Sequence, residues 1–465
     1  MALGRRRDKF QQDLMVPTSA LPRSPGHPFY VALNALLSDA QFDNYVEDLC
    51  APLYREGGRP SIPPGVYFRM LFVGYFEGID SQRGIAWRCS DSLSLRSFLG
   101  LKPTETTPDH SSLTIIRQRL PKELIEQVFS FVLKLAFEKK MLKGKSIGID
   151  STTLEANAAM KSIVRKDGGA TWKAYLRQLA KEAGIDDPSD AELRRFDRKR
   201  KGKKTSNDDW ESPSDPDARI TKMKDGTTDL AYKAENAVDL DSEIIVAADV
   251  TPANEADSET GKDTVVDAQG NLNDATDQLC TIVEVVADKG YHKAATLAWL
   301  EERGVRSYIP EREEKRKRRW RDKPDGWREA VYENRRRVAR DKGKALQKRR
   351  AEVVERGFAH LCETGAGRRT WLRGMVEVGK RYLVHAMAHN LGVILRQLIG
   401  VGKPREWAAI RATLAPLQAI WATFLALLVK MDARISQLMP DLIGASVAPY
   451  FDHRAGRIAP SSTGC

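Results

Sequence analysis

The chain has 465 residues, 42% of them hydrophobic and 30% charged, which is an ordinary composition for a water-soluble protein of two or three domains. Its 75 Lys and Arg exceed the 63 Asp and Glu, so the formal net charge is +12, and an excess of this size favours a polyanionic partner such as nucleic acid. Five scattered cysteines with no CxxC pair exclude a zinc finger and a disulfide framework, and no phosphate-binding glycine loop indicates ATP or NAD.

No membrane segment is expected. The basic N-terminus has no apolar core after it, unlike a signal peptide, and the most apolar stretch, Leu414 to Val429, is too short for a membrane span. We expect that stretch to pack inside the protein or against a partner chain. The scattered cysteines fit a reducing compartment, so the predicted location is the cytoplasm.

Residues 1–140 are predicted to form an all-helical domain. Apolar residues recur at near-helical spacing from Pro64 to Gly78, and Pro63 with Pro64 suits a helix entrance. A short helix is expected from Ser81 to Cys89. Another, from Ser111 to Leu120, carries Arg117 beside its apolar face, so this residue is a candidate DNA contact.

The pattern changes to period two after Gly144, where Ile147 and Ile149 predict a strand that ends at Asp150. A polar, charge-rich insertion is expected near 155–228. Its basic run and its Ser, Asp and Pro cluster are typical of a segment that is mobile or that orders on a partner.

An α/β arrangement follows the insertion. Strands are expected over 229–238 and 242–250, then a helix around 262–271, and then a β-branched strand over 280–287 that ends at Asp288. A helix over 293–303 and a strand over 305–309 complete the series. Residues 141–400 are therefore predicted to form a mixed sheet flanked by helices.

A basic insertion is predicted near 311–350, where 18 Lys and Arg face 8 Asp and Glu and Trp320 and Trp327 are interleaved. Such a run is often only a solvated face, but beside a metal site it favours DNA contact. The candidate DNA-binding residues here are Arg316, Lys317, Arg318 and Arg319, with Arg349 and Arg350 at its end.

Apolar residues at positions 354, 358 and 361 predict that Glu355 lies on the next helix, flanking its buried face. A further helix is expected from Val384 to Leu398. His385 and His389 lie on it without the intervening acid of a zincin, so we interpret them as packing or surface residues. Residues 401–465 are predicted to be a helical extension.

Three carboxylates from separate elements could hold two divalent cations near phosphate: Asp150, Asp288 and Glu355. Phosphodiester chemistry needs an activated oxygen nucleophile, charge relief in the transition state and help for the leaving oxygen, and two Mg²⁺ ions supply all three. An Asp at a strand end is alone more often a turn former or a helix cap. Beside this site, Lys289, Tyr291 and His292 could position DNA or could be ordinary turn residues.

Several segments, in order, carry a resemblance to a known family: GRPSIPPGVYFRMLFVGYFEGIDSQRGIAWRCSDSLSLRSFLGL, TPDHSSLTIIRQRL, GIDSTTLEANA, YKAENAVDLDSEIIVAADVTPANEAD, VADKGYH, VVERGF and LRGMVEVGKRYLVHAMAHNL. With them the chain resembles the bacterial insertion-sequence transposases of the DDE class. The resemblance runs from about His27 to Arg396. It implies an RNase H-like catalytic domain behind a helical N-terminal domain.

Carried over by motif, the resemblance assigns the catalytic triad to Asp150, Asp288 and Glu355, with Glu352 as the rival for the third position. The family often marks the glutamate helix with a tyrosine and an arginine upstream and a lysine downstream. Here Lys348, Ala351 and Cys362 occupy those places, so the accessory DNA contacts differ from the family pattern.

The resemblance implies a Mg²⁺-dependent enzyme, with two ions that Mn²⁺ can replace, that recognises the terminal inverted repeats of its element. It would hydrolyse the transposon ends and join the freed 3′ hydroxyls to target double-stranded DNA, as a homodimer or larger assembly in the bacterial nucleoid. The residues alone leave two alternatives open: a catalytically inactive DNA-binding derivative, and a stand-alone RNase H-like nuclease.

Overall fold

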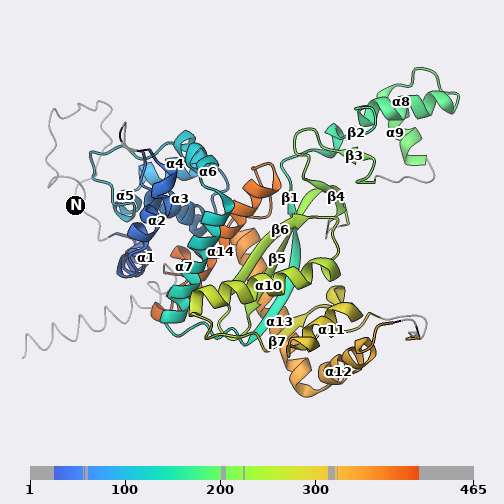
Figure 1. Cartoon of the computed structure of the whole chain (residues 1–465). Coiled ribbons are helices and arrows are strands. Elements are labelled where there is room, and N and C mark those ends of the chain that lie inside the picture. Colours follow the sequence, from blue (N-terminus) through green and yellow to red (C-terminus); the bar gives the residue numbers. More distant parts are fainter. Residues whose placement is uncertain are drawn as a thin grey trace, which may run out of the picture. The chain divides into compact units, whose positions relative to one another are not determined.

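The computed structural model describes residues 26–407, except for 56, 58–60, 200–205, 224–225, 313–319 and 322 (Figure 1). The predicted helical extension therefore lies largely outside the described residues, as do the apolar stretch 414–429 and the four basic residues Arg316 to Arg319. Residues up to Pro404 belong to one compact unit.

The N-terminal part is helical, as predicted. Its helices are α1 (Pro28–Asp39), α2 (Phe42–Cys50), η2 (Ala51–Leu53), α3 (Pro64–Glu77), α4 (Gln82–Asp91), α5 (Leu93–Phe98), α6 (His110–Arg119) and α7 (Lys122–Glu138). Ser81, Ser92 and Asp109 cap three of them by accepting backbone hydrogen bonds, and Gly78 ends α3 at a positive φ of 68°. The helices pack around fully buried aromatic rings: Phe29, Phe42, Phe68 and Phe72.

A six-stranded mixed sheet follows, formed by β1 (Ser146–Glu155), β4 (Arg219–Lys222), β5 (Thr228–Asp239), β6 (Ile245–Pro252), β7 (Glu284–Ala287) and β8 (Arg306–Tyr308). Strand β5 pairs antiparallel with β4, β6 and β1, whereas β1, β7 and β8 run parallel. The predicted strands are confirmed, although β1 continues five residues beyond Asp150. The predicted α/β mixed sheet behind a helical N-terminal part is confirmed as well.

Helices cover both faces of this sheet. On one face α10 (Asp257–Thr276) packs on β5, where Thr260 and Thr264 donate hydrogen bonds to Glu235. On the other face lie α13 (Asp341–Ala359) and α14 (Met375–Ile399); the Tyr382 hydroxyl of α14 donates to Asn236, the next residue of β5. The alternation of β5 side chains therefore decides which helix each residue meets.

The long helix α14 also joins the sheet to the N-terminal helices, because it packs against α7 and α3 as well as β6. Near the far strands lie η4 (Lys289–Tyr291), α11 (Ala294–Glu302), α12 (Trp327–Ala339) and the π-helical turn η5 (His360–Thr364). Asn334 of α12 exchanges hydrogen bonds with both backbone groups of Ile309, which fixes α12 beside β8.

The insertion between β1 and β4 contains regular structure of its own. It holds η3 (Met160–Ser162), β2 (Val164–Arg165), α8 (Trp172–Glu182), α9 (Asp190–Lys199) and β3 (Trp210–Glu211) (Figure 1). A small core of Leu176, Ala180 and Leu193 joins α8 to α9. The sequence pattern did not predict these elements, since the charges of this segment mask its short apolar periodicity.

Candidate active site

Asp150 and Asp288 lie at neighbouring strand ends. Strand β7 stops at Ala287, which pairs with Ile149, so Asp150 is the first residue of β1 beyond its partner strand. Asp288 follows β7 directly, and its carboxylate accepts a 2.6 Å hydrogen bond from the Gly290 amide in η4. The expected meeting of these two strand ends is present in the structure.

The Asp150 carboxylate is held by two donors. The Ser151 amide donates to Oδ1 at 2.8 Å, and the Arg350 guanidinium, on α13, donates to Oδ2 at 2.7 Å. Burial raises the pKa of Asp150 above its ordinary value, Arg350 and the Ser151 amide lower it, and the charge of Asp288 raises it again. The two aspartates are therefore close enough to interact electrostatically.

Helix α13 presents an amide and a guanidinium to this end of the sheet. Gln347 donates a 3.0 Å hydrogen bond to the Ala287 carbonyl, at the last residue of β7, and accepts one from Arg350. Farther along the helix, a Cβ on Gly148 would lie 3.1 Å from Val354, so the absence of a side chain on Gly148 lets α13 approach β1 closely.

The structure does not bring Glu355 together with the two aspartates. Glu355 is exposed, whereas its neighbour Val354 is fully buried against β1. The five residues from Arg350 to Glu355 correspond to about 7.5 Å along a helix and about 140° around it. The rival Glu352 is also exposed and pairs with Arg349 and Arg356.

Three further charged residues lie beside the site, and the sequence did not predict them as part of it. Lys233 and Glu235 of β5 are buried, and Asp257 is the first residue of α10. Lys233 Nζ donates to Thr260 Oγ1 at 2.9 Å and to Asp257 Oδ1 at 3.4 Å, and the Ser151 hydroxyl donates to Asp257 Oδ1 at 2.8 Å. Their sequence signal is the pair Lys233 and Glu235, two apart in an otherwise apolar strand.

The predicted DNA-positioning residues of the turn differ in exposure. Lys289 is exposed next to Asp288. Tyr291 is only 2% exposed, and its ring packs where a Cβ on Gly261 of α10 would lie 2.6 Å from it. The His292 side chain is also 2% exposed and lies 3.9 Å from Glu311. Of the three, only Lys289 offers its side chain to a DNA surface in this structure.

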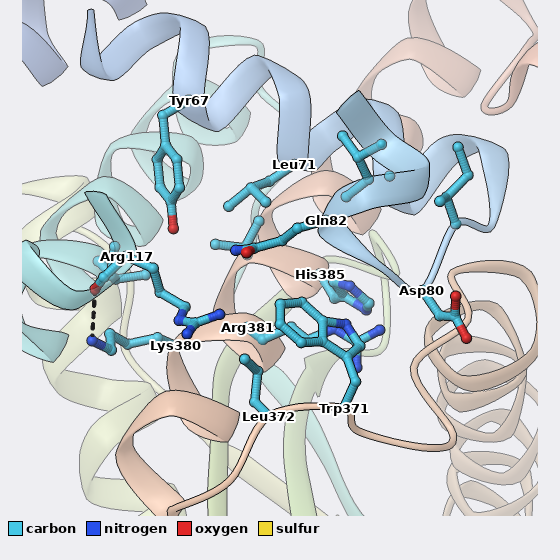
Figure 2. Close-up of a pocket in the computed structure, with 15 residues that line it drawn as sticks. Tyr67, Leu71, Asp80, Gln82, Arg117, Trp371, Leu372, Lys380, Arg381 and His385 are labelled. Atoms are coloured by element: carbon cyan, nitrogen blue, oxygen red, sulfur yellow. Dashed lines mark hydrogen bonds between the residues drawn. The ribbon is translucent and has the colours of Figure 1, made fainter. Parts of the chain in front are cut away.

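Arg117, another predicted DNA contact, lies between α6 and α14 (Figure 2). Its Nε donates to Glu377 at 2.7 Å, and its guanidinium stacks 5.3 Å from the Trp371 ring centroid. Lys380 completes the junction by donating to the carbonyls of Arg117 and Leu120. The 13% exposure of its side chain means that Arg117 joins two parts of the fold rather than facing DNA.

Arg349 and Arg350 also have internal partners. Arg349 donates to the Leu240 carbonyl and pairs with Glu243 at 3.4 Å, but its side chain remains 37% exposed. Arg350 is held by Asp150 inside the site. Arg349 can therefore reach DNA from its present position, whereas Arg350 would first have to leave Asp150.

The donor set partly fits a divalent cation. Two carboxylates at adjacent strand ends are hard oxygen ligands of the kind that Mg²⁺ and Mn²⁺ prefer. Within the described ranges, however, no three Asp, Glu, His or Cys side chains are arranged to hold a metal. The physical reason is that Arg350 and the Ser151 amide occupy both oxygens of Asp150.

Comparison with known families agrees with the geometry. Residues 19–119 match the family described as Transposase domain (DUF772), and residues 209–391 match the Transposase DDE domain. No curated protein and no solved structure is found to match the chain. Within the described part of the chain, no helix has the length and apolar character needed to cross a membrane.

The second match contains β5 to β8, Asp288 and α13, and the strand that bears Asp150 pairs with both β5 and β7. DDE domains have an RNase H-like fold and belong to metal-dependent enzymes that cleave DNA. The chain is therefore a DDE transposase of the insertion-sequence type.

Proposed function

We propose that this transposase binds the terminal inverted repeats of its own element, cleaves the ends by Mg²⁺-dependent hydrolysis and joins the freed 3′ hydroxyls to target DNA. The observation that carries the proposal is the convergence of Asp150 and Asp288 at the ends of β1 and β7. Two DNA ends must meet in one complex, so we propose a homodimer or larger assembly on DNA.

Asp150 and Asp288 would hold the divalent cations, of which we propose two, with Mn²⁺ able to replace Mg²⁺. When bound, these ions relieve phosphate charge and activate the attacking oxygen. Lys289, exposed beside Asp288, would contact the DNA backbone, together with Arg349 and the basic residues Arg316 to Arg319.

Glu355 remains our proposed third catalytic carboxylate. Because α13 presents Gln347 and Arg350 to the strand ends, Glu355 can take part only if α13 shifts or turns when DNA binds. The same shift would release Asp150 from Arg350. An active site that assembles on its substrate would prevent cleavage of unrelated DNA.

A second candidate, a catalytically inactive DNA-binding derivative, is favoured by one observation: α13 presents no carboxylate to the aspartates. A stand-alone nuclease is the third. Incubating wild-type protein and Mg²⁺ with a duplex that carries the element's end, and with a scrambled duplex of equal length, separates the three. Our proposal expects cutting at the junction of the end only. Equal cutting of both duplexes indicates a nuclease, and binding without cutting indicates the inactive derivative.

A further inference from the structure

We infer that Asp257 is a third carboxylate of the divalent-cation site, acting with Asp150 and Asp288 in the free protein. The inference rests on the proposed metal-dependent function and adds to it a residue that lies outside the expected triad. It concerns the protein before DNA binds, when α13 keeps Glu355 away from the strand ends.

The first argument is the approach of two carboxylates to Gly290. A Cβ placed on Gly290 would lie 2.8 Å from Asp288 Oδ1 and 2.9 Å from Asp257 Oδ2. Both oxygens thus lie within 3 Å of one point, and a glycine there leaves the space between them open. Asp257 Oδ1 already accepts from Ser151 and Lys233, but no hydrogen bond to Oδ2 occurs among the described residues.

The second argument is a buried hydroxyl without a hydrogen-bond partner. Tyr291 is 2% exposed, and among the described residues its hydroxyl forms no hydrogen bond, although Ser151 is close enough to lower its pKa. Burial raises the pKa of Tyr291, and the charges of Glu235, Asp257 and Asp150 raise it further. A buried hydroxyl beside carboxylates is costly unless it has a partner, and a water of a bound cation would provide one.

The third argument is the charge balance. Four carboxylates gather here, those of Asp150, Glu235, Asp257 and Asp288, and the cationic side chains that pair with them are Arg350 and Lys233. Arg312 lies nearby but donates to the carbonyls of Lys289 and Gly290 instead. The contacts of the described residues thus leave two negative charges without a paired side chain, which suits one divalent cation.

A purely structural role for Asp257 makes a different prediction. Asp257 could only tie α10 to β1 through Ser151 and Lys233, in which case metal affinity would not depend on it. The isosteric change Asp257→Asn keeps an oxygen that can accept from both donors. Lys233 also keeps the Glu255 carbonyl and the Thr260 hydroxyl, so we expect the variant to fold.

The test measures Mn²⁺ binding to the full chain without DNA, from the electron paramagnetic resonance signal of free Mn²⁺. Asp257→Asn should weaken binding by at least about tenfold, since affinity follows the number of charged ligands. The matched control is Glu259→Gln in the same first turn of α10, an exposed residue paired with Lys293, which should bind like wild type. Asp288→Asn and Asp150→Asn should also lose binding.

The outcomes separate the two proposals. If Asp257→Asn binds Mn²⁺ like wild type while Asp288→Asn does not, the role of Asp257 is overturned and the proposed function stands. If Asp288→Asn and Asp150→Asn also bind like wild type, or if wild type binds no Mn²⁺, both are overturned. As a second variant, Asp257→Cys should let Cd²⁺ displace Mn²⁺ more readily than in wild type, because thiolate prefers soft metals; unchanged displacement would contradict the inference.

Discussion

Arg350 and Asp150 form a 2.7 Å salt bridge that joins α13 to the end of β1, and both side chains are mostly buried, at 10% and 23% exposure. The guanidinium thereby neutralises the carboxylate that the proposed function assigns to a divalent cation. Arg350 and the cation would compete for Asp150, so the salt bridge holds the site closed until the metal or the DNA displaces it.

Arg350→Gln tests this competition. The variant leaves Asp150 desolvated without its charged partner, so we expect a loss of about 1–3 kcal/mol in the free energy of unfolding without metal. Mg²⁺ should then raise the melting temperature of the variant more than that of wild type. Arg356→Gln, near the partly exposed end of the same helix, is the control. An equal Mg²⁺ effect on wild type and Arg350→Gln would show that no competition occurs.

Glu355→Gln separates the two stages of the proposed site. Since Glu355 is exposed and distant from the aspartates in the free protein, the variant should bind Mn²⁺ like wild type in the absence of DNA. It should nevertheless lose cleavage of end-bearing DNA by at least about a hundredfold, corresponding to about 2.7 kcal/mol of transition-state stabilisation. Glu352→Gln, on the same helix, serves as the matched control. Normal cleavage by Glu355→Gln would remove that residue from the active site.

The basic insertion predicts a salt effect on DNA binding. Replacing Arg316, Lys317, Arg318 and Arg319 by glutamine should reduce the steepness of log affinity against log salt by about 0.9 for each phosphate that the variant no longer neutralises. The measurement is a fluorescence anisotropy titration of a labelled duplex at several salt concentrations. Should the slope stay the same, the segment is only a solvated face.

Buried histidines predict a loss of stability in acid. Burial, followed by the charges of His360, Arg396 and Lys403, lowers the pKa of His389 from 6.5 to about 3. Between these values the unfolded chain takes up a proton that the folded chain does not. The free energy of unfolding should therefore fall as the pH is lowered through this window, by about 1.4 kcal/mol per pH unit for each such histidine.

His389→Gln should reduce this pH dependence, measured by urea unfolding at a series of pH values. His385, whose pKa is also lowered by burial, will maintain part of it. The control is His110→Gln, since the His110 side chain is 38% exposed and should leave the pH dependence as in wild type. A variant at His389 with the full wild-type slope would contradict the assignment.

Much of the fold follows from the sequence because its strands and helices have clear periodicity. The β-branched run before Asp288 and the alternation before Asp150 predicted two neighbouring strand ends, and β1 and β7 pair in parallel there. The prediction for His385 and His389 as packing residues is confirmed, since both are buried on α14.

The surroundings of the site were harder to predict because they depend on the rotation of helices. Periodicity placed Glu355 on a helix that flanks its buried face, but only the packing of Val354 against Gly148 decides that Arg350 points at Asp150. Asp257 was missed for the same reason. The start of α10 lies five residues before the segment that was predicted to be helical, and proximity to Gly290 is a tertiary fact.

The most direct test of the central claim is Mg²⁺-dependent cleavage of a labelled duplex with the element's own end and flank, comparing wild type with Asp288→Asn. Wild type should cut at the end, and Asp288→Asn should bind the duplex with nearly the same affinity and leave it intact, since removing a metal ligand removes several kcal/mol of transition-state stabilisation. Specific cutting by both proteins would contradict the assignment of Asp288, and binding without cutting by either would contradict the claim that this chain is an active transposase.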